Sequence, residues 1–93
     1  MKFEWDPQKA VRNLNDHKVS FTEAATVFHD FLSITFPDPD HSIGEHRYII
    51  IGTSHRGRLL FVSHAERGED RIRIISARKA TRNERKFYEE TYK

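Results

Sequence analysis

The most constraining stretch of this chain is Arg71–Arg85, where a β-strand pattern carries arginine at alternate positions. Successive side chains of a strand point to opposite faces, so Arg71-Ile72-Arg73-Ile74 predicts a sheet with one aliphatic and one cationic face. A core face needs aliphatic side chains, whereas the planar guanidinium group matches a phosphate. We therefore expect a strand whose open face binds an anion.

Charge is distributed unevenly along the chain. The first 45 residues are acidic and the remainder is strongly basic, although the formal net charge is only +2. This asymmetry favours an anionic partner on the C-terminal half. The alternative is that the two halves neutralise each other in the fold.

Size and composition narrow the class of protein. A length of 93 residues predicts one domain, residues 1–93, with a small core. The absence of cysteine excludes disulfides, a thiolate nucleophile and Cys-ligated zinc, and it fits a reducing cytoplasm. The N-terminus lacks the apolar region of a signal peptide, and the run Ile49–Ile51 is far too short to span a membrane. We expect a cytoplasmic protein without a membrane partner.

Capping signals mark three helices. Asp6 and Pro7 predict a helix that runs to about His17. Ser20 and Glu23 match a capping box before a second amphipathic helix. A second capping box, Thr81-x-x-Glu84, predicts a C-terminal helix to about Tyr92.

Alternating and β-branched runs predict the strands between these helices. They cover residues 32–36, 47–53, 58–65 and 71–78, and Phe3–Trp5 is a candidate small edge strand. The short turns between the last three require antiparallel pairing. The order predicts an α+β fold with two N-terminal helices, a four-stranded antiparallel meander sheet and a C-terminal helix.

A candidate catalytic cluster lies where one predicted strand turns into the arginine strand. His64 and Glu66 share a face there, and Arg67 begins the turn. Antiparallel pairing would bring them near Arg71 and Arg73. RNA cleavage without a metal needs a base for the 2′-hydroxyl proton, cations for the phosphorane and an acid for the leaving oxygen. His64 fits base or acid and Glu66 fits base, whereas the alternative is ordinary cross-strand ion pairing.

In a regular strand, the side chain of Arg78 would not point to the same face as those of Arg71 and Arg73. Strict alternation places it with Ile72 and Ile74, opposite Arg71 and Arg73. Either a bulge near Ser76 re-aims the chain, or only one set of arginines reaches the site. We favour Arg78 over Arg71, for which a carboxylate partner such as Glu69 or Glu66 is the simpler expectation.

Other residues allow two interpretations. Tyr88 could stack on a base of single-stranded RNA or anchor its helix to the core. Glu45 and Arg47 predict an ion pair that is either structural or directed to the site. His41, Glu45 and His46 match no metal-binding spacing, so we expect neither a metal nor another cofactor.

Three segments, Phe3–Phe28, Asp38–Val62 and Ile72–Glu89, resemble the BrnT family of toxins from bacterial type II toxin–antitoxin systems. The resemblance covers nearly the whole chain in matching order. Two positions depart from the family pattern: Lys18 replaces a usual glycine, and Phe31 replaces a usual proline. Both departures lie in the helical half, away from the arginine strand.

The resemblance implies a metal-independent ribonuclease of RelE-like fold that inhibits translation by cleaving mRNA. It also implies a BrnA-like antitoxin that neutralises the toxin, contributes operator DNA binding to the complex and dimerises, so that toxin copies could pair within a hetero-oligomer. The family's motifs match Glu45 and Arg47; His64, Glu66 and Arg67; Arg73, Ser76 and Arg78; and Glu84, Arg85 and Tyr88.

We therefore predict an endoribonuclease toxin. The predicted catalytic residues are His64, Glu66, Arg67, Arg73 and Arg78, and the predicted RNA-binding residues are Arg47, Arg71, Arg85 and Tyr88. The alternative is a non-catalytic module that binds nucleic acid or an acidic partner, or a degenerate toxin that acts only as a co-repressor subunit.

Overall fold

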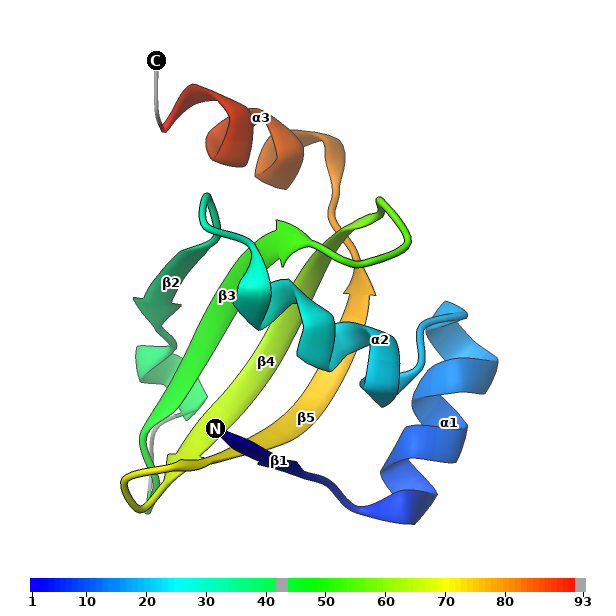
Figure 1. Ribbon diagram of the computed structural model, residues 1–93, viewed down its shortest axis with the longest axis vertical. Helices are drawn as coiled ribbons and strands as arrows, with labels where there is room; N and C mark the ends of the chain where they lie inside the picture. Colours follow the sequence, from blue (N-terminus) through cyan, green and yellow to red (C-terminus); the bar gives the residue numbers. More distant parts are fainter. Residues whose placement is uncertain (42–43, 92–93) are drawn as a thin grey trace.

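A computed structural model describes residues 1–41 and 44–91. Its elements are β1 (Lys2–Glu4), α1 (Pro7–His17), α2 (Phe21–Thr26), the 3-10 helix η1 (Val27–His29), β2 (Ile34–Pro37), the 3-10 helix η2 (Pro39–His41), β3 (Arg47–Thr53), β4 (Leu59–Arg67), β5 (Arg71–Lys79) and α3 (Arg82–Glu90) (Figure 1). The predicted α+β class is confirmed, and most predicted bounds agree within two residues. The predicted end of the last helix near Tyr92 falls outside the described residues.

The sheet differs from the predicted four-stranded antiparallel meander. It has five strands in the order β1-β5-β4-β3-β2, and β1 pairs with β5 in parallel. The segment Phe3–Trp5 was expected only as a small edge strand, and the observed strand adds Lys2 in place of Trp5. The antiparallel run from β2 to β5 was predicted correctly.

The two N-terminal helices cover one face of the sheet (Figure 1). Aliphatic side chains of this face pack against side chains of α2 and its flanking segments. The sheet contributes Ile50, Leu60, Val62, Ile74 and Ala77 to this main core, and the helical segment contributes Val19, Phe21, Ala24 and Val27. We call this face of the sheet the helix face. Burial of this apolar surface is the main source of stability for so small a chain.

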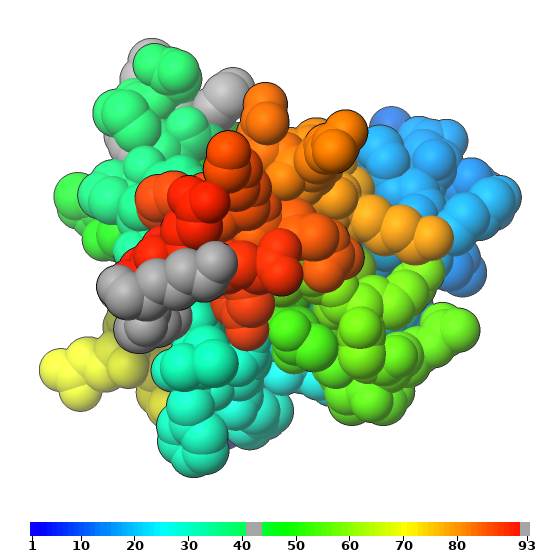
Figure 2. Space-filling model, turned by 90° about the horizontal axis from the view of Figure 1, so that it is seen from above, coloured from blue at the N-terminus to red at the C-terminus, as the bar shows by residue number. Residues whose placement is uncertain are grey.

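The opposite face is only partly covered. Tyr88 of α3 packs with Ile49, Ile51 and Leu59 in a second, smaller core, and Phe87 meets Phe36 edge to face with ring centroids 6.2 Å apart. Seen from above, α3 lies across one end of the molecule (Figure 2). The other end of this face is uncovered. We call this whole second face of the sheet, opposite the helix face, the open face.

The observed helix caps agree with those predicted from the sequence, with one exception. Asp6 caps α1, and the Thr81 and Glu84 side chains form the predicted capping box of α3. Ser20 accepts from the backbone N–H of Glu23, but Glu23 does not complete a capping box. Its carboxylate is buried and accepts hydrogen bonds from Ser54 and Arg58 instead. Among the described residues, no helix has the length and apolar character to cross a membrane.

Candidate functional site

A bulge in β5 places Arg73 and Arg78 on the same face of the sheet. Ser63 of β4 pairs with Ser76, but the next residue, His64, pairs with Ile74, so Ile75 is left without a partner. The extra residue shifts the alternation between Arg73 and Arg78. Both arginines therefore lie on the open face, while Ile74 and Ala77 are buried in the core of the helix face.

Two arginines, from the strands on either side of β4, share one rung of the sheet. Ala65 of β4 is in register with Arg47 of β3 on one side and with Arg73 of β5 on the other. Paired residues point to the same face, so both guanidinium groups extend from the open face. Within the described chain, Arg73 has no ion pair. This rung is the strongest candidate for binding a phosphate.

Glu45 links this rung to Arg67. Its carboxylate lies 3.2 Å from Nε of Arg47 and 3.7 Å from a terminal nitrogen of Arg67. The Glu45–Arg47 pair was predicted, but the contact with Arg67 was not. The only sequence signal was Glu45 two residues before Arg47, where both side chains share a face. The contact places a carboxylate among the cations of the open face.

Arg78 lies at the other end of the open face. Its guanidinium forms a bidentate pair with Glu84, with N–O distances of 2.8 and 2.9 Å, and stacks over the Phe61 ring at 4.0 Å. The hydrogen bonds from Arg78 lower the pKa of the Glu84 carboxyl, against burial, which raises it. Arg78 is thus fixed in place by α3, and its cationic surface beside Phe61 is about one-third exposed.

A groove runs along the open face from Arg47 to Phe61, the ring on which Arg78 stacks. Its volume is about 510 Å³, and it is lined by one cation and one carboxylate, Arg47 and Asp38, together with Phe36, Pro37, Pro39, Ile49, Phe61, Ser63, Ile75 and Ser76. The floor follows the rung in which Ile49, Ser63 and Ser76 are in register. The open face therefore offers a concave surface between its cationic groups and is more than a set of separate ion pairs.

His64 and Glu66 share a face as predicted, but it is the helix face. His64 is in register with Tyr48 and Ile74, is only 2 % exposed, and packs against the Phe28 and Tyr48 rings at 4.9 and 5.9 Å. Burial lowers the pKa of His64 to about 4. The expected meeting of His64 and Glu66 with the arginines does not occur, because β4 directs the two groups to opposite faces of the sheet.

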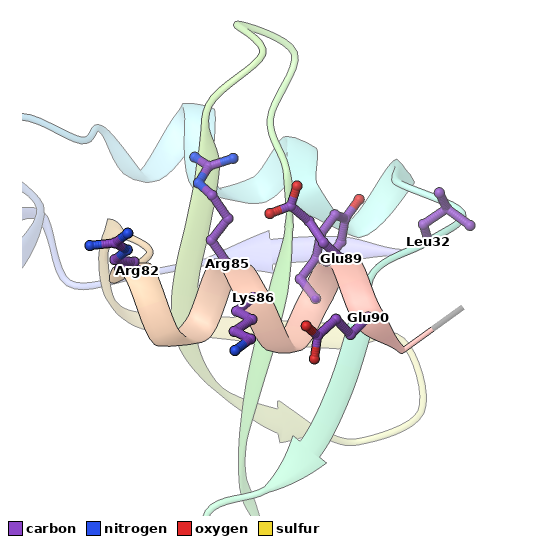
Figure 3. A pocket seen from close by; sticks show the side chains of 7 residues that line it. Leu32, Arg82, Arg85, Lys86, Glu89 and Glu90 are labelled. Carbon is purple, nitrogen blue, oxygen red and sulfur yellow. The ribbon is translucent and has the colours of Figure 1, made fainter. Parts of the chain in front are cut away.

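The remaining predicted residues lie at the margins. Arg71 is exposed, and its guanidinium is 3.9 Å from Glu4, rather than beside the expected Glu69 or Glu66. Tyr88 donates a 2.7 Å hydrogen bond to Asp30 and packs in the smaller core, which fits the anchoring interpretation. Arg85 lines a separate surface pocket along α3 with Arg82, Lys86 and Glu89, and its side chain extends away from those of Lys86 and Glu90 (Figure 3).

The open face can hold a polyanion and polarise a phosphate. Fixed guanidinium groups stabilise charge that develops on phosphoryl oxygens, and a nearby carboxylate can accept a proton. No group of three His, Asp, Glu or Cys side chains suited to a metal occurs in residues 1–41 and 44–91.

Comparisons with known proteins identify relatives. A family model described as "Ribonuclease toxin, BrnT, of type II toxin-antitoxin system" matches residues 5–84. The crystal structure of the Brucella abortus ribonuclease toxin BrnT is similar to this one, with a TM-score of 0.70 and 23 % sequence identity over 88 % of this chain and 99 % of that chain. No curated protein matches the sequence. The matched structure shares the fold, and the family match covers both the arginine strand and β3 and β4.

Proposed function

Because the chain belongs to the BrnT family of ribonuclease toxins of type II toxin–antitoxin systems, we propose that it cleaves single-stranded RNA on the open face, without a metal ion. The observation that carries this proposal is the rung of Arg47, Ala65 and Arg73, with Glu45 beside it. It combines one cation held by Glu45, and a second without an ion pair in the described chain, with a carboxylate at one end of a groove of about 510 Å³.

In the proposed reaction, Arg47, Arg67 and Arg73 hold the phosphate and stabilise the phosphorane. Glu45 takes the proton of the 2′-hydroxyl, whose oxygen forms a bond to phosphorus while the bond to the 5′-oxygen breaks. The leaving 5′-oxygen takes a proton from solvent. The products are a 2′,3′-cyclic phosphate and a 5′-hydroxyl. Removing one such electrostatic stabiliser typically costs about 10²–10³ in rate.

The proposal changes several predicted roles. His64 and Glu66 are left out because they lie on the helix face, away from the groove. Glu45 takes the role of base that they were expected to fill. Arg78 binds a neighbouring phosphate rather than the reacting one, and Arg71 and Arg85 contribute only to the surrounding positive field. Tyr88 anchors α3.

The proposed biological role goes beyond the family description, which names a ribonuclease toxin of a type II toxin–antitoxin system. The toxin would cleave mRNA in the cytoplasm and inhibit translation. A BrnA-like antitoxin would neutralise it by covering the open face, and operator DNA would be bound only through the antitoxin complex, which could hold two toxin copies. The exposed arginines offer charge complementarity to an acidic antitoxin segment.

Incubating the purified protein with single-stranded RNA in excess EDTA tests the reaction. We expect cleavage that leaves 2′,3′-cyclic phosphate ends and is lost in the Glu45→Gln variant. Cleavage that stops with EDTA, or that leaves 3′-hydroxyl ends, would contradict the mechanism. Intact RNA together with tight, salt-sensitive binding would instead indicate the non-catalytic module.

A further inference from the structure

The groove on the open face lies between two cationic rungs. Arg47, Ala65 and Arg73 form one rung, and Phe61 pairs with Arg78 in another. The rung of Ile49, Ser63 and Ser76 lies between them, and same-face rungs are about 7 Å apart along a strand. The two cationic rungs are therefore four residues apart along β4, about 13 Å.

The walls of the groove suit a flat ring. Phe36 and Phe61 are aromatic, and Ile49 and Ile75 add aliphatic surface. Ile75 lines the groove although it is the bulged residue without a strand partner, so the bulge that aligns the arginines also contributes an apolar wall. Binding sites for planar ligands combine such walls with a few polar groups, and RNA-binding proteins hold unstacked bases this way.

The floor supplies the polar groups. Ser63 and Ser76 face each other across β4 and β5, and the structure gives neither hydroxyl a hydrogen-bond partner among residues 1–41 and 44–91. A hydroxyl both donates and accepts, so each can bind the edge of a base. Phosphate binding alone needs neither these hydroxyls nor the apolar walls.

We infer that this groove is a nucleobase subsite, which holds the base of the nucleotide whose phosphate lies on Arg47 and Arg73. The inference rests on the proposed ribonuclease function and deepens it. The arginines fix the backbone without regard to sequence, and Ser63, Ser76 and Ile75 determine which base precedes or follows the cut. The groove is thus the specificity-determining part of the open face.

A binding titration separates the subsite from the reaction. Amide NMR of the full chain would be followed on adding each of the four nucleoside 3′-monophosphates, with ribose 5-phosphate as the probe that lacks a base. We expect every probe to shift Arg47 and Arg73, and the best-bound nucleotide alone to shift Ser63, Ile75 and Ser76 as well. Its affinity should exceed that of ribose 5-phosphate.

Matched variants test the hydroxyls. Ser63→Val combined with Ser76→Val should weaken binding of that nucleotide about tenfold and leave ribose 5-phosphate binding unchanged. Thr35→Val, on an exposed position of the edge strand β2, is the control and should change neither. NMR spectra would confirm folding of each variant before titration.

The outcomes distinguish the two proposals. Equal affinities for ribose 5-phosphate and all four nucleotides, with shifts confined to the arginines, would overturn the subsite and leave RNA cleavage unaffected. Base-dependent shifts at Ser63 and Ser76 in a protein that leaves RNA intact would support the subsite and remove the cleavage reaction.

Discussion

Arg47 and Arg73 extend from the open face on either side of Ala65, which is in register with both and fully buried. A larger side chain at this position would stand between the two guanidinium groups, so alanine allows both to approach one phosphate. Arg47 is held by Glu45, whereas no ion pair of Arg73 occurs in the described chain. The rung thus combines one fixed and one adaptable cation.

Arg73→Gln should lower the rate of RNA cleavage about 10²-fold, because Arg73 has no competing carboxylate and acts on the phosphate directly. The free energy of unfolding should change by less than about 0.5 kcal/mol, because Arg73, which is half-buried, has no ion pair in the described chain. Cleavage of a labelled RNA and urea denaturation measure the two effects. Arg12→Gln removes an exposed arginine from α1 and is the control. Equal rates for the two variants would remove Arg73 from the site.

Tyr88→Phe should destabilise the protein by about 2 kcal/mol, because it removes a hydrogen bond to the charged Asp30 carboxylate. The ring remains, so its packing in the smaller core is kept. RNA cleavage at a temperature where the variant is folded should be unchanged. Thermal unfolding and the cleavage assay test this, and a variant of normal stability with reduced cleavage would restore Tyr88 as an RNA-binding residue.

Local sequence signals predicted most helices and strands, but they did not predict the pairing of strands that are far apart in the sequence. The caps at Asp6 and Thr81 identified α1 and α3 because capping is chemistry between neighbours in sequence. The parallel pairing of β1 with β5 joins residues about 70 positions apart, and no periodicity identifies such a partner. The five-stranded mixed sheet was therefore missed.

The candidate site shows the same division. Alternation placed Leu60, Val62 and His64 on one face, so the sequence already associated His64 with core positions, but its chemistry favoured a catalytic interpretation. The parity of Arg78 left two alternatives, a bulge near Ser76 or a single set of arginines that reaches the site, and the structure has the bulge, at Ile75. The contact of Glu45 with Arg67 depends on how the loop before β3 approaches the end of β4, which no local pattern specifies.

Lys18→Gly should stabilise the protein by about 0.5–1 kcal/mol. Lys18 ends α1 in the left-handed region, at φ 59° and ψ 31°, where a side chain is disfavoured and glycine is not. The greater entropy of glycine in the unfolded chain offsets part of this gain. Lys18→Ala retains the Cβ atom and is the control, and it should not stabilise. Denaturant midpoints compare the two, and equal values would contradict the backbone explanation.

Glu23→Gln should destabilise the protein by about 3 kcal/mol. It should also reduce the slope of the free energy of unfolding against pH below about pH 4.5. Hydrogen bonds from Arg58 lower the pKa of Glu23 to about 2, with burial opposing and Ser54 assisting. In the wild type, the carboxyl of the unfolded chain binds a proton at a higher pH than that of the folded chain. The contribution of Glu23 to the free energy of unfolding is therefore complete above about pH 4.5 and is lost as the pH falls from about 4.5 to 2. Denaturation at several pH values measures the slope, with exposed Glu69→Gln as the control.

His64→Leu should remove the contribution of His64 to the pH dependence of stability between about pH 6.5 and 4. Burial lowers the pKa of His64 to about 4, with a hydrogen bond to the Val62 backbone opposing, so the unfolded imidazole is protonated at a higher pH than the folded one. Stability in the wild type should fall by on the order of 3 kcal/mol as the pH drops through this window. The measured quantity is the slope of the free energy of unfolding against pH, which a uniform loss of packing energy does not change. Exposed His55→Leu is the control and should keep the wild-type slope. If His64 instead acts on RNA, the folded His64→Leu variant would lose cleavage; we expect it to retain the wild-type rate at pH 7.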